Sequence, residues 1–116
     1  MLTNCHQYVE TVLALYRLLP DTPHRHSRYD RRLATQLCQQ NLSLPLIESA
    51  FLLATTRRLH RDPSYPPLSP IRSLHYFLPV IEELRDQPLP PSYIQYLRLK
   101  LASLLPPVHL PPLNLP

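Results

Sequence analysis

The feature that most limits how this chain can fold is which residues it has for turns and linkers. Its 116 residues include no glycine and sixteen prolines, thirteen of them from Pro63 onward. Glycine supplies the positive φ angles that tight hairpins and phosphate-binding loops need, so we expect neither a Walker-type loop nor a dinucleotide-binding fingerprint. Proline is favoured at the first position of a helix and cannot continue one. The sequence therefore predicts short helices joined by rigid, extended linkers.

Apolar residues recur at spacings of three and four residues along most of the chain, which is typical of amphipathic helices. No segment alternates with the period of a strand. The predicted fold class is therefore all-α, with about five short helices in a compact orthogonal bundle. The helices are expected over residues 3–19, 27–40, 45–60, 70–86 and 92–105. The expected core consists of Leu33, Leu37, Ile47, Phe51, Leu74, Phe77 and Ile81.

The predicted helix starts rest on local signals. Ser27 is followed three residues later by an acidic residue, which matches a capping box, and Pro45 stands at the start of the third helix, with Glu48 expected in its first turn. The pair Ser69 and Pro70 marks the start of the fourth helix. Pro79 lies inside the fourth apolar stripe, and because the stripe continues on both sides we expect one bent helix there.

The length of the chain predicts one helical domain over residues 1–105. Residues 106–116, with five prolines in eleven residues, are expected to form an extended tail. No apolar run approaches the roughly 18–20 residues that span a membrane, and the first residues lack the pattern of a signal peptide. We therefore expect a cytoplasmic protein, in which Cys5 and Cys38 are two buried thiols. A disulfide between the first two helices is the alternative.

The basic residues are almost all arginine, eleven of twelve, and the net charge is +4. Arginine suits bidentate contact with phosphate. The arginines form two clusters, one over residues 25–32 and one over residues 57–61. If the second and third helices pack antiparallel, these two clusters share one edge and form a phosphate-binding surface. The alternative is that these arginines cap helix ends and pair with acidic neighbours. The candidate nucleic-acid-binding residues are Arg25, Arg28, Arg31, Arg32, Arg57, Arg58 and Arg61.

Two further patterns bear on nucleic-acid binding. The segment 33–47 resembles a helix-turn-helix motif, because its apolar positions have a similar spacing; these are Leu33, Ala34, Leu37, Leu44 and Ile47. In that comparison the third helix would be the recognition helix. Three tyrosines near basic residues are candidates for stacking on bases or, alternatively, for half-buried packing; these are Tyr29, Tyr65 and Tyr76.

Motifs for metal binding or catalysis are missing from the sequence. No CxxC or HxxxH spacing is present, so we expect no metal site. Glu82 and Glu83 are adjacent and point to different sides of a helix, so they cannot act as a carboxylate pair. Ser73 and His75 have no acid at helical spacing to orient them. We therefore expect a protein that is not an enzyme and uses no cofactor.

The segment 69–84 reads Ser-Pro-Ile-Arg-Ser-Leu-His-Tyr-Phe-Leu-Pro-Val-Ile-Glu-Glu-Leu. It resembles small helical modules of bacterial replication initiators and of accessory proteins of mobile elements. The resemblance implies an accessory protein of a replication, recombination or transposition machine that binds nucleic acid, with DNA favoured over RNA. The alternative function is a protein–protein interaction adaptor, whose proline-rich linkers and arginines dock on a larger partner protein.

Overall fold

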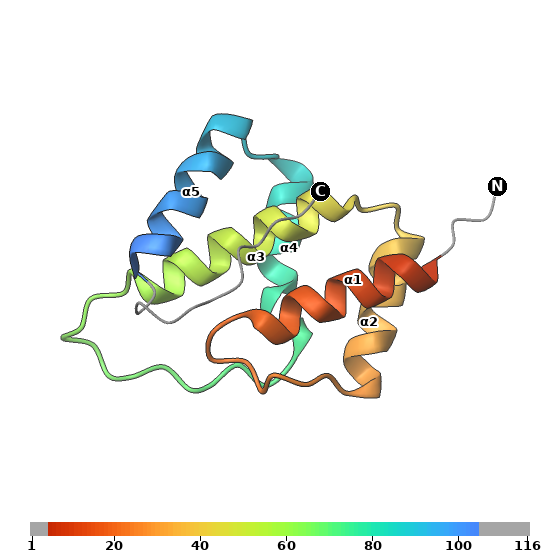
Figure 1. Cartoon of the computed structure of the whole chain (residues 1–116), viewed down its shortest axis with the longest axis horizontal. Coiled ribbons are helices and arrows are strands. Elements are labelled where there is room, and N and C mark those ends of the chain that lie inside the picture. The colour runs from red at the N-terminus through yellow and green to blue at the C-terminus, as the bar shows by residue number, and fades with distance from the viewer. Residues whose placement is uncertain (1–4, 105–116) are drawn as a thin grey trace.

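The computed structural model describes residues 5–104, which form five α-helices and one short 3₁₀ helix (Figure 1). In chain order these are α1 (Cys5–Leu18), α2 (Arg28–Gln39), α3 (Leu44–Leu59), η1 (Leu74–Phe77), α4 (Leu78–Asp86) and α5 (Pro91–Leu104). No strand occurs within residues 5–104, and the all-α class is confirmed. The tail expected over residues 106–116 lies outside the described part of the chain.

Two of the predicted helix starts form as expected. The Ser27 side chain accepts a hydrogen bond from the Asp30 backbone N–H at 3.2 Å, and the Asp30 carboxylate accepts one from the Ser27 N–H at 2.9 Å. This is the reciprocal capping box that the sequence predicts. Ser43 caps α3 through the Leu46 N–H, and Pro45 lies in the first turn. Both starts depend only on residues within one turn.

The chain makes its left-handed turns without glycine. Asp21, His24 and Asn41 have φ angles of 64°, 60° and 61°. Asparagine and aspartate tolerate this region better than other residues with a side chain, because their short polar groups bond to the nearby backbone. Two of these residues lie in the loop before α2, and Asn41 follows its C-cap residue Gln40, so left-handed turns occur on both sides of this helix.

Helix α3 forms the centre of the molecule. Every residue from Ile47 to Thr56 is buried, because α1, α4, α5 and η1 all pack against this helix. All seven expected core residues are buried in one cluster, which confirms that prediction. Phe77 lies at its middle, with ring centroids 4.9 Å from Phe51 and 6.2 Å from Tyr16. Glu48 lies beyond the first turn of α3, in an ion pair with Arg98 of α5.

The fourth predicted helix is wrong in its start and its continuity. Ser69 and Pro70 belong to an extended segment, and helical structure begins only at Leu74, as the 3₁₀ helix η1. Helix α4 then begins at Leu78, with Pro79 in its first turn. Because Pro79 has no N–H to donate to the carbonyl four residues earlier, it suits the start of a new helix better than the interior of a longer one.

The expectation of two free thiols is also wrong. A disulfide joins Cys5, at the start of α1, to Cys38, in the last turn of α2. Helices α1 and α2 pack against one another, which brings the two Cα atoms to 5.9 Å, within the range that a disulfide spans. The structure therefore has the disulfide between the first two helices, which is the alternative given above.

Candidate nucleic-acid interface

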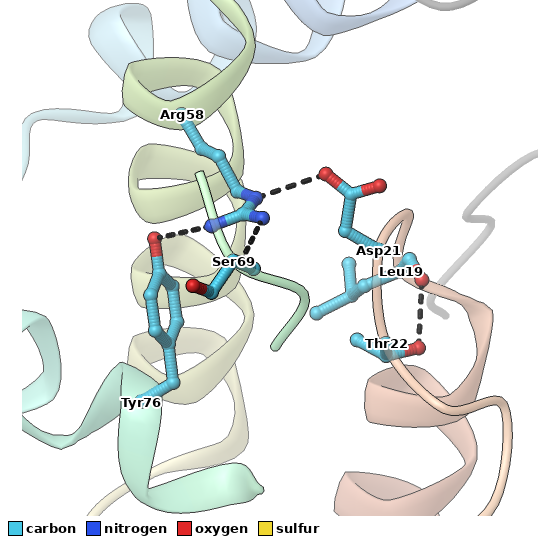
Figure 2. Close-up of polar contacts among 6 residues, drawn as sticks. All are labelled: Leu19, Asp21, Thr22, Arg58, Ser69 and Tyr76. Carbon is cyan, nitrogen blue, oxygen red and sulfur yellow. Dashed lines mark hydrogen bonds and ion pairs between the residues drawn. The ribbon is translucent and has the colours of Figure 1, made fainter. Parts of the chain in front are cut away.

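The connector between α1 and α2, residues 19–27, is held to the body of the protein by several hydrogen bonds. Thr22 is buried, and its hydroxyl donates to the Leu19 carbonyl at 2.8 Å (Figure 2). The Ile71 N–H donates to the Asp21 carbonyl at 2.9 Å. These bonds give the basic connector a defined path next to the segment that precedes η1.

Arg58 joins three parts of the chain at this place (Figure 2). Its guanidinium donates to the Asp21 carboxylate at 2.9 Å, to the Ser69 carbonyl at 2.6 Å and to the Tyr76 hydroxyl at 3.4 Å. The side chain of Arg58 is only 6% exposed. A guanidinium with three partners and little exposure supports the structure around it and is a poor candidate for phosphate binding.

The extended segment 69–73 brings a further arginine to the connector. Ile71 is tied to Asp21, and the Leu74 N–H donates to the buried Asp30 carboxylate at 2.9 Å. Ile71 and Leu74 are buried, whereas Arg72 between them is exposed. Sequence reasoning missed Arg72, because it lies 40 positions after Arg32 and no local pattern connects the two.

Four arginines near the connector and α2 form what we call the basic face: Arg25, Arg28, Arg32 and Arg72. All four are exposed. Within residues 5–104, three of them form no hydrogen bond or ion pair, and Arg28 contacts only the ring of Tyr29, with its guanidinium carbon 5.4 Å from the ring centroid. Their positive charge is therefore available to an external anion.

The carboxylates of α1, the connector and α2 form hydrogen bonds or ion pairs with groups outside the basic face. Glu10 pairs with Arg31 at 2.8 Å, and this hydrogen bond lowers the pKa of Glu10. Asp21 pairs with Arg58, and Asp30 accepts hydrogen bonds from two backbone N–H groups. Within residues 5–104, no acidic side chain forms an ion pair with any of the four arginines of the basic face.

The second arginine cluster has partners within the fold. Arg57 forms two hydrogen bonds with Glu83 of α4, at 2.9 and 2.8 Å, which raise the pKa of Arg57 and lower that of Glu83. Arg61 donates to the Pro66 carbonyl and lies over the ring of Tyr65. These contacts match the alternative in which arginines at a helix end serve the structure.

The two clusters do not share the edge that antiparallel packing would produce. Helix α2 packs on α1 and η1 and does not lie along α3. Figure 1 shows the start of α2 and the end of α3 on different sides of the molecule. The assumed antiparallel packing is therefore wrong, since α1 covers the apolar face of α2. The role of the individual arginines in nucleic-acid binding stays a prediction.

The burial of α3 also bears on the helix-turn-helix hypothesis. A recognition helix needs an exposed face that enters the groove of DNA. Because α3 is buried from Ile47 to Thr56, it has no such face along these turns. The spacing that resembles the motif is the spacing of core residues: Leu33, Ala34, Leu37 and Ile47 are buried, and Leu44 is half-buried.

A metal site and a surface hollow are further places where a ligand could bind. No group of three or more histidine, cysteine, aspartate or glutamate side chains within residues 5–104 could hold a metal ion. A shallow hollow of about 360 Å³ lies between α3, α4 and the loop before η1, lined by Ala54, Arg57, Arg58, Leu68, Tyr76 and Val80. Its two arginines already have partners.

None of the helices in this part of the chain has both the length and the apolar character to cross a membrane.

No family model matches the chain, and no curated protein or solved structure matches it. The resemblance of residues 69–84 to replication and mobile-element modules stays a prediction.

Proposed function

We propose that this protein binds nucleic acid without catalysing a reaction, as an accessory to a replication, recombination or transposition machine. The observation that carries the proposal is the basic face, because its four exposed guanidinium groups have no acidic partner in the described part of the chain. Guanidinium groups form strong, bidentate hydrogen bonds with phosphate. The resemblance of residues 69–84 to DNA-handling modules favours DNA over RNA.

The structure divides the seven candidate arginines into two groups. Arg25, Arg28 and Arg32 belong to the basic face, and Arg72 joins them. Arg31 and Arg57 are each held by a carboxylate, which competes with phosphate for the guanidinium, and Arg61 donates to the Pro66 carbonyl. For these reasons we assign phosphate binding to the basic face and a structural role to Arg58.

With this function we propose a cytoplasmic location. The cytoplasm keeps thiols reduced, so the interface must also form when the bond between Cys5 and Cys38 is open. The packing of α1 on α2 and the hydrogen bonds of the connector support the basic face in that state.

The test is a titration of the full chain into labelled DNA at several salt concentrations, followed by fluorescence anisotropy. Each phosphate contact contributes about 0.9 to the log–log salt slope on duplex DNA and about 0.7 on a single strand. Replacing Arg25, Arg32 and Arg72 together by alanine should therefore flatten the slope by about 2–3 units. A matched control replaces Arg57, Arg85 and Lys100, which removes the same charge elsewhere and should change the slope by less than about 1 unit.

The outcomes distinguish a wrong assignment of the interface from a wrong function. A control that flattens the slope as strongly as the first variant would show that the arginines of the basic face are not the specific phosphate contacts, and would overturn their assignment. A wild-type protein without salt-dependent affinity for any nucleic acid would overturn the proposed function.

The adaptor is the second candidate, and one observation favours it. Residues 62–70 are all exposed and include four prolines, while Arg58 and Arg61 hold this segment through the carbonyls of Ser69 and Pro66. An extended proline-rich segment held in this way suits docking into an aromatic groove of a partner. A titration that finds no nucleic-acid binding would leave this as the favoured function.

A further inference from the structure

We propose that the basic face binds single-stranded nucleic acid, with Tyr29 stacking on an unpaired base. This inference rests on the proposed function and adds the class of ligand. Tyr29 is the second residue of α2, and its side chain is 56% exposed. On α2 it lies next to Arg28 and one helical turn before Arg32, which are two arginines of the basic face.

The environment of the Tyr29 ring suits stacking. The guanidinium of Arg28 lies over the ring, 5.4 Å from its centroid, and the ring does not belong to the core. The remaining exposed area is open to a flat, apolar partner. An aromatic ring beside guanidinium groups is the combination that single-strand-binding proteins use, because the ring stacks on a base while the cations bind the neighbouring phosphates.

Duplex DNA does not offer the same contact. Its bases are stacked on one another, so their faces are closed to a side chain unless a base is first unstacked. An unpaired strand presents every base face and follows a basic groove or face with its phosphates. The position of Tyr29 on α2 beside Arg28 and Arg32 therefore favours the single strand.

The other two candidate tyrosines are placed differently. The Tyr76 hydroxyl accepts a hydrogen bond from Arg58, and its ring packs against Phe77 at a centroid distance of 5.0 Å. Tyr65 is 60% exposed and lies under Arg61, but it belongs to the loop that leaves the end of α3 (Figure 1). Tyr65 matches Tyr29 in exposure and in its arginine contact and lacks the surrounding basic face, which makes it a control.

The experiment compares three probes of one sequence: a DNA single strand, the corresponding duplex and an RNA single strand. We expect the wild type to bind a single strand more tightly than the duplex. Tyr29→Ala should weaken single-strand binding about five- to a hundredfold and leave duplex binding within about twofold. Tyr29→Phe should bind like the wild type, because phenylalanine keeps the ring. Tyr65→Ala should change neither affinity.

A second measurement observes stacking directly. The chain contains no tryptophan, so Tyr29→Trp introduces a single fluorescent indole at the proposed contact. Stacking on a base should quench its emission when a single strand is added, and duplex should quench it much less. Circular dichroism of each variant checks that the fold is kept, which we expect because the ring is outside the core.

Three results would overturn the inference and leave the proposed function standing. These are equal affinity for duplex and single strand, an equal loss on both probes with Tyr29→Ala, and an indole emission that no single strand changes. Absence of binding to all three probes would instead overturn the proposed function. The tighter of the two single strands identifies DNA or RNA as the ligand.

Discussion

Asp30 is a buried carboxylate that serves two distant parts of the chain. One oxygen accepts the Ser27 N–H and completes the cap of α2, while the other accepts the Leu74 N–H at the start of η1. Asp30 is only 2% exposed. It therefore determines how the first turn of α2, which carries Arg28 and Tyr29, lies against the rest of the protein.

Replacing Asp30 by alanine should lower the free energy of unfolding by about 3 kcal/mol. The change removes two charge-assisted hydrogen bonds and leaves the buried Leu74 N–H without a partner. Denaturation in urea measures the loss. Asp30→Asn keeps a carbonyl acceptor and should lose less than the alanine variant; equal losses would show that the hydrogen bonds contribute little.

Replacing Phe77 by alanine should cost about 3–5 kcal/mol, as expected for a fully buried aromatic side chain. The cavity would open where Phe77 meets Tyr16, Phe51 and Tyr76. Thermal and urea unfolding give the value. A loss below about 1 kcal/mol would contradict the position of Phe77 at the centre of the core.

At the scale of the helices, α2 and α3 differ in how their faces are used. Helix α2 buries one face against α1 and η1 and exposes the other, whereas α3 is enclosed by four neighbours. This difference explains why Arg28 and Arg32, on the exposed face of α2, have no ion pair within residues 5–104, whereas arginines at the end of α3 are bound to other elements. The pair of Arg57 and Glu83 is one such link, between α3 and α4.

The stability of the α3–α4 contact should fall in acid. The hydrogen bonds from Arg57 lower the pKa of Glu83 below its usual value of 4.5. The pair therefore contributes above this value and loses its contribution as the pH falls through the lower pKa of the folded state. Glu83→Gln should reduce the acid dependence of the melting temperature between about pH 5 and pH 3. The effect should be small, because both side chains are half exposed to solvent.

Arg57→Gln is the control for this prediction. If the ion pair causes the acid dependence, this variant should reduce it by a similar amount. An unchanged acid dependence in both variants would assign it to other carboxylates, such as Glu10, whose pKa is also lowered.

At the scale of the whole molecule, the disulfide closes a long loop that contains α1, the connector and most of α2. Its two cysteines are 33 positions apart. Such a link stabilises a protein mainly by restricting the unfolded chain, here by about 3–4 kcal/mol. Adding a reductant should lower the free energy of unfolding by about this amount. The double variant Cys5→Ser/Cys38→Ser should be less stable and insensitive to reductant.

Affinity for nucleic acid should be nearly the same in the oxidised and reduced protein. The bonds that place the basic face join Asp21, Asp30 and Arg58 to other segments and do not involve the disulfide. Anisotropy titrations with and without reductant compare the two forms. A large loss of affinity on reduction would show that the α1–α2 link is needed to form the interface.

The all-α class, the core and the caps of α2 and α3 follow from local patterns in the chain. Apolar spacing selects the buried face of a helix, and the cap of Ser27 involves a residue only three positions away. The prediction of one continuous fourth helix is wrong because its apolar stripe is continuous, although Pro79 cannot donate the hydrogen bond that a continuous helix needs.

Whether an arginine is paired within the fold depends on contacts between residues that are far apart in the sequence. Arg58 meets Asp21 across 37 positions, and Arg57 meets Glu83 across 26. Such pairs form only after the helices have taken their packing angles, which no local periodicity specifies. The sequence could therefore indicate where arginines are concentrated. Only the tertiary structure decides which of them are bound within the fold and which face the solvent, because each guanidinium pairs with whatever carboxylate or carbonyl the packing brings within reach.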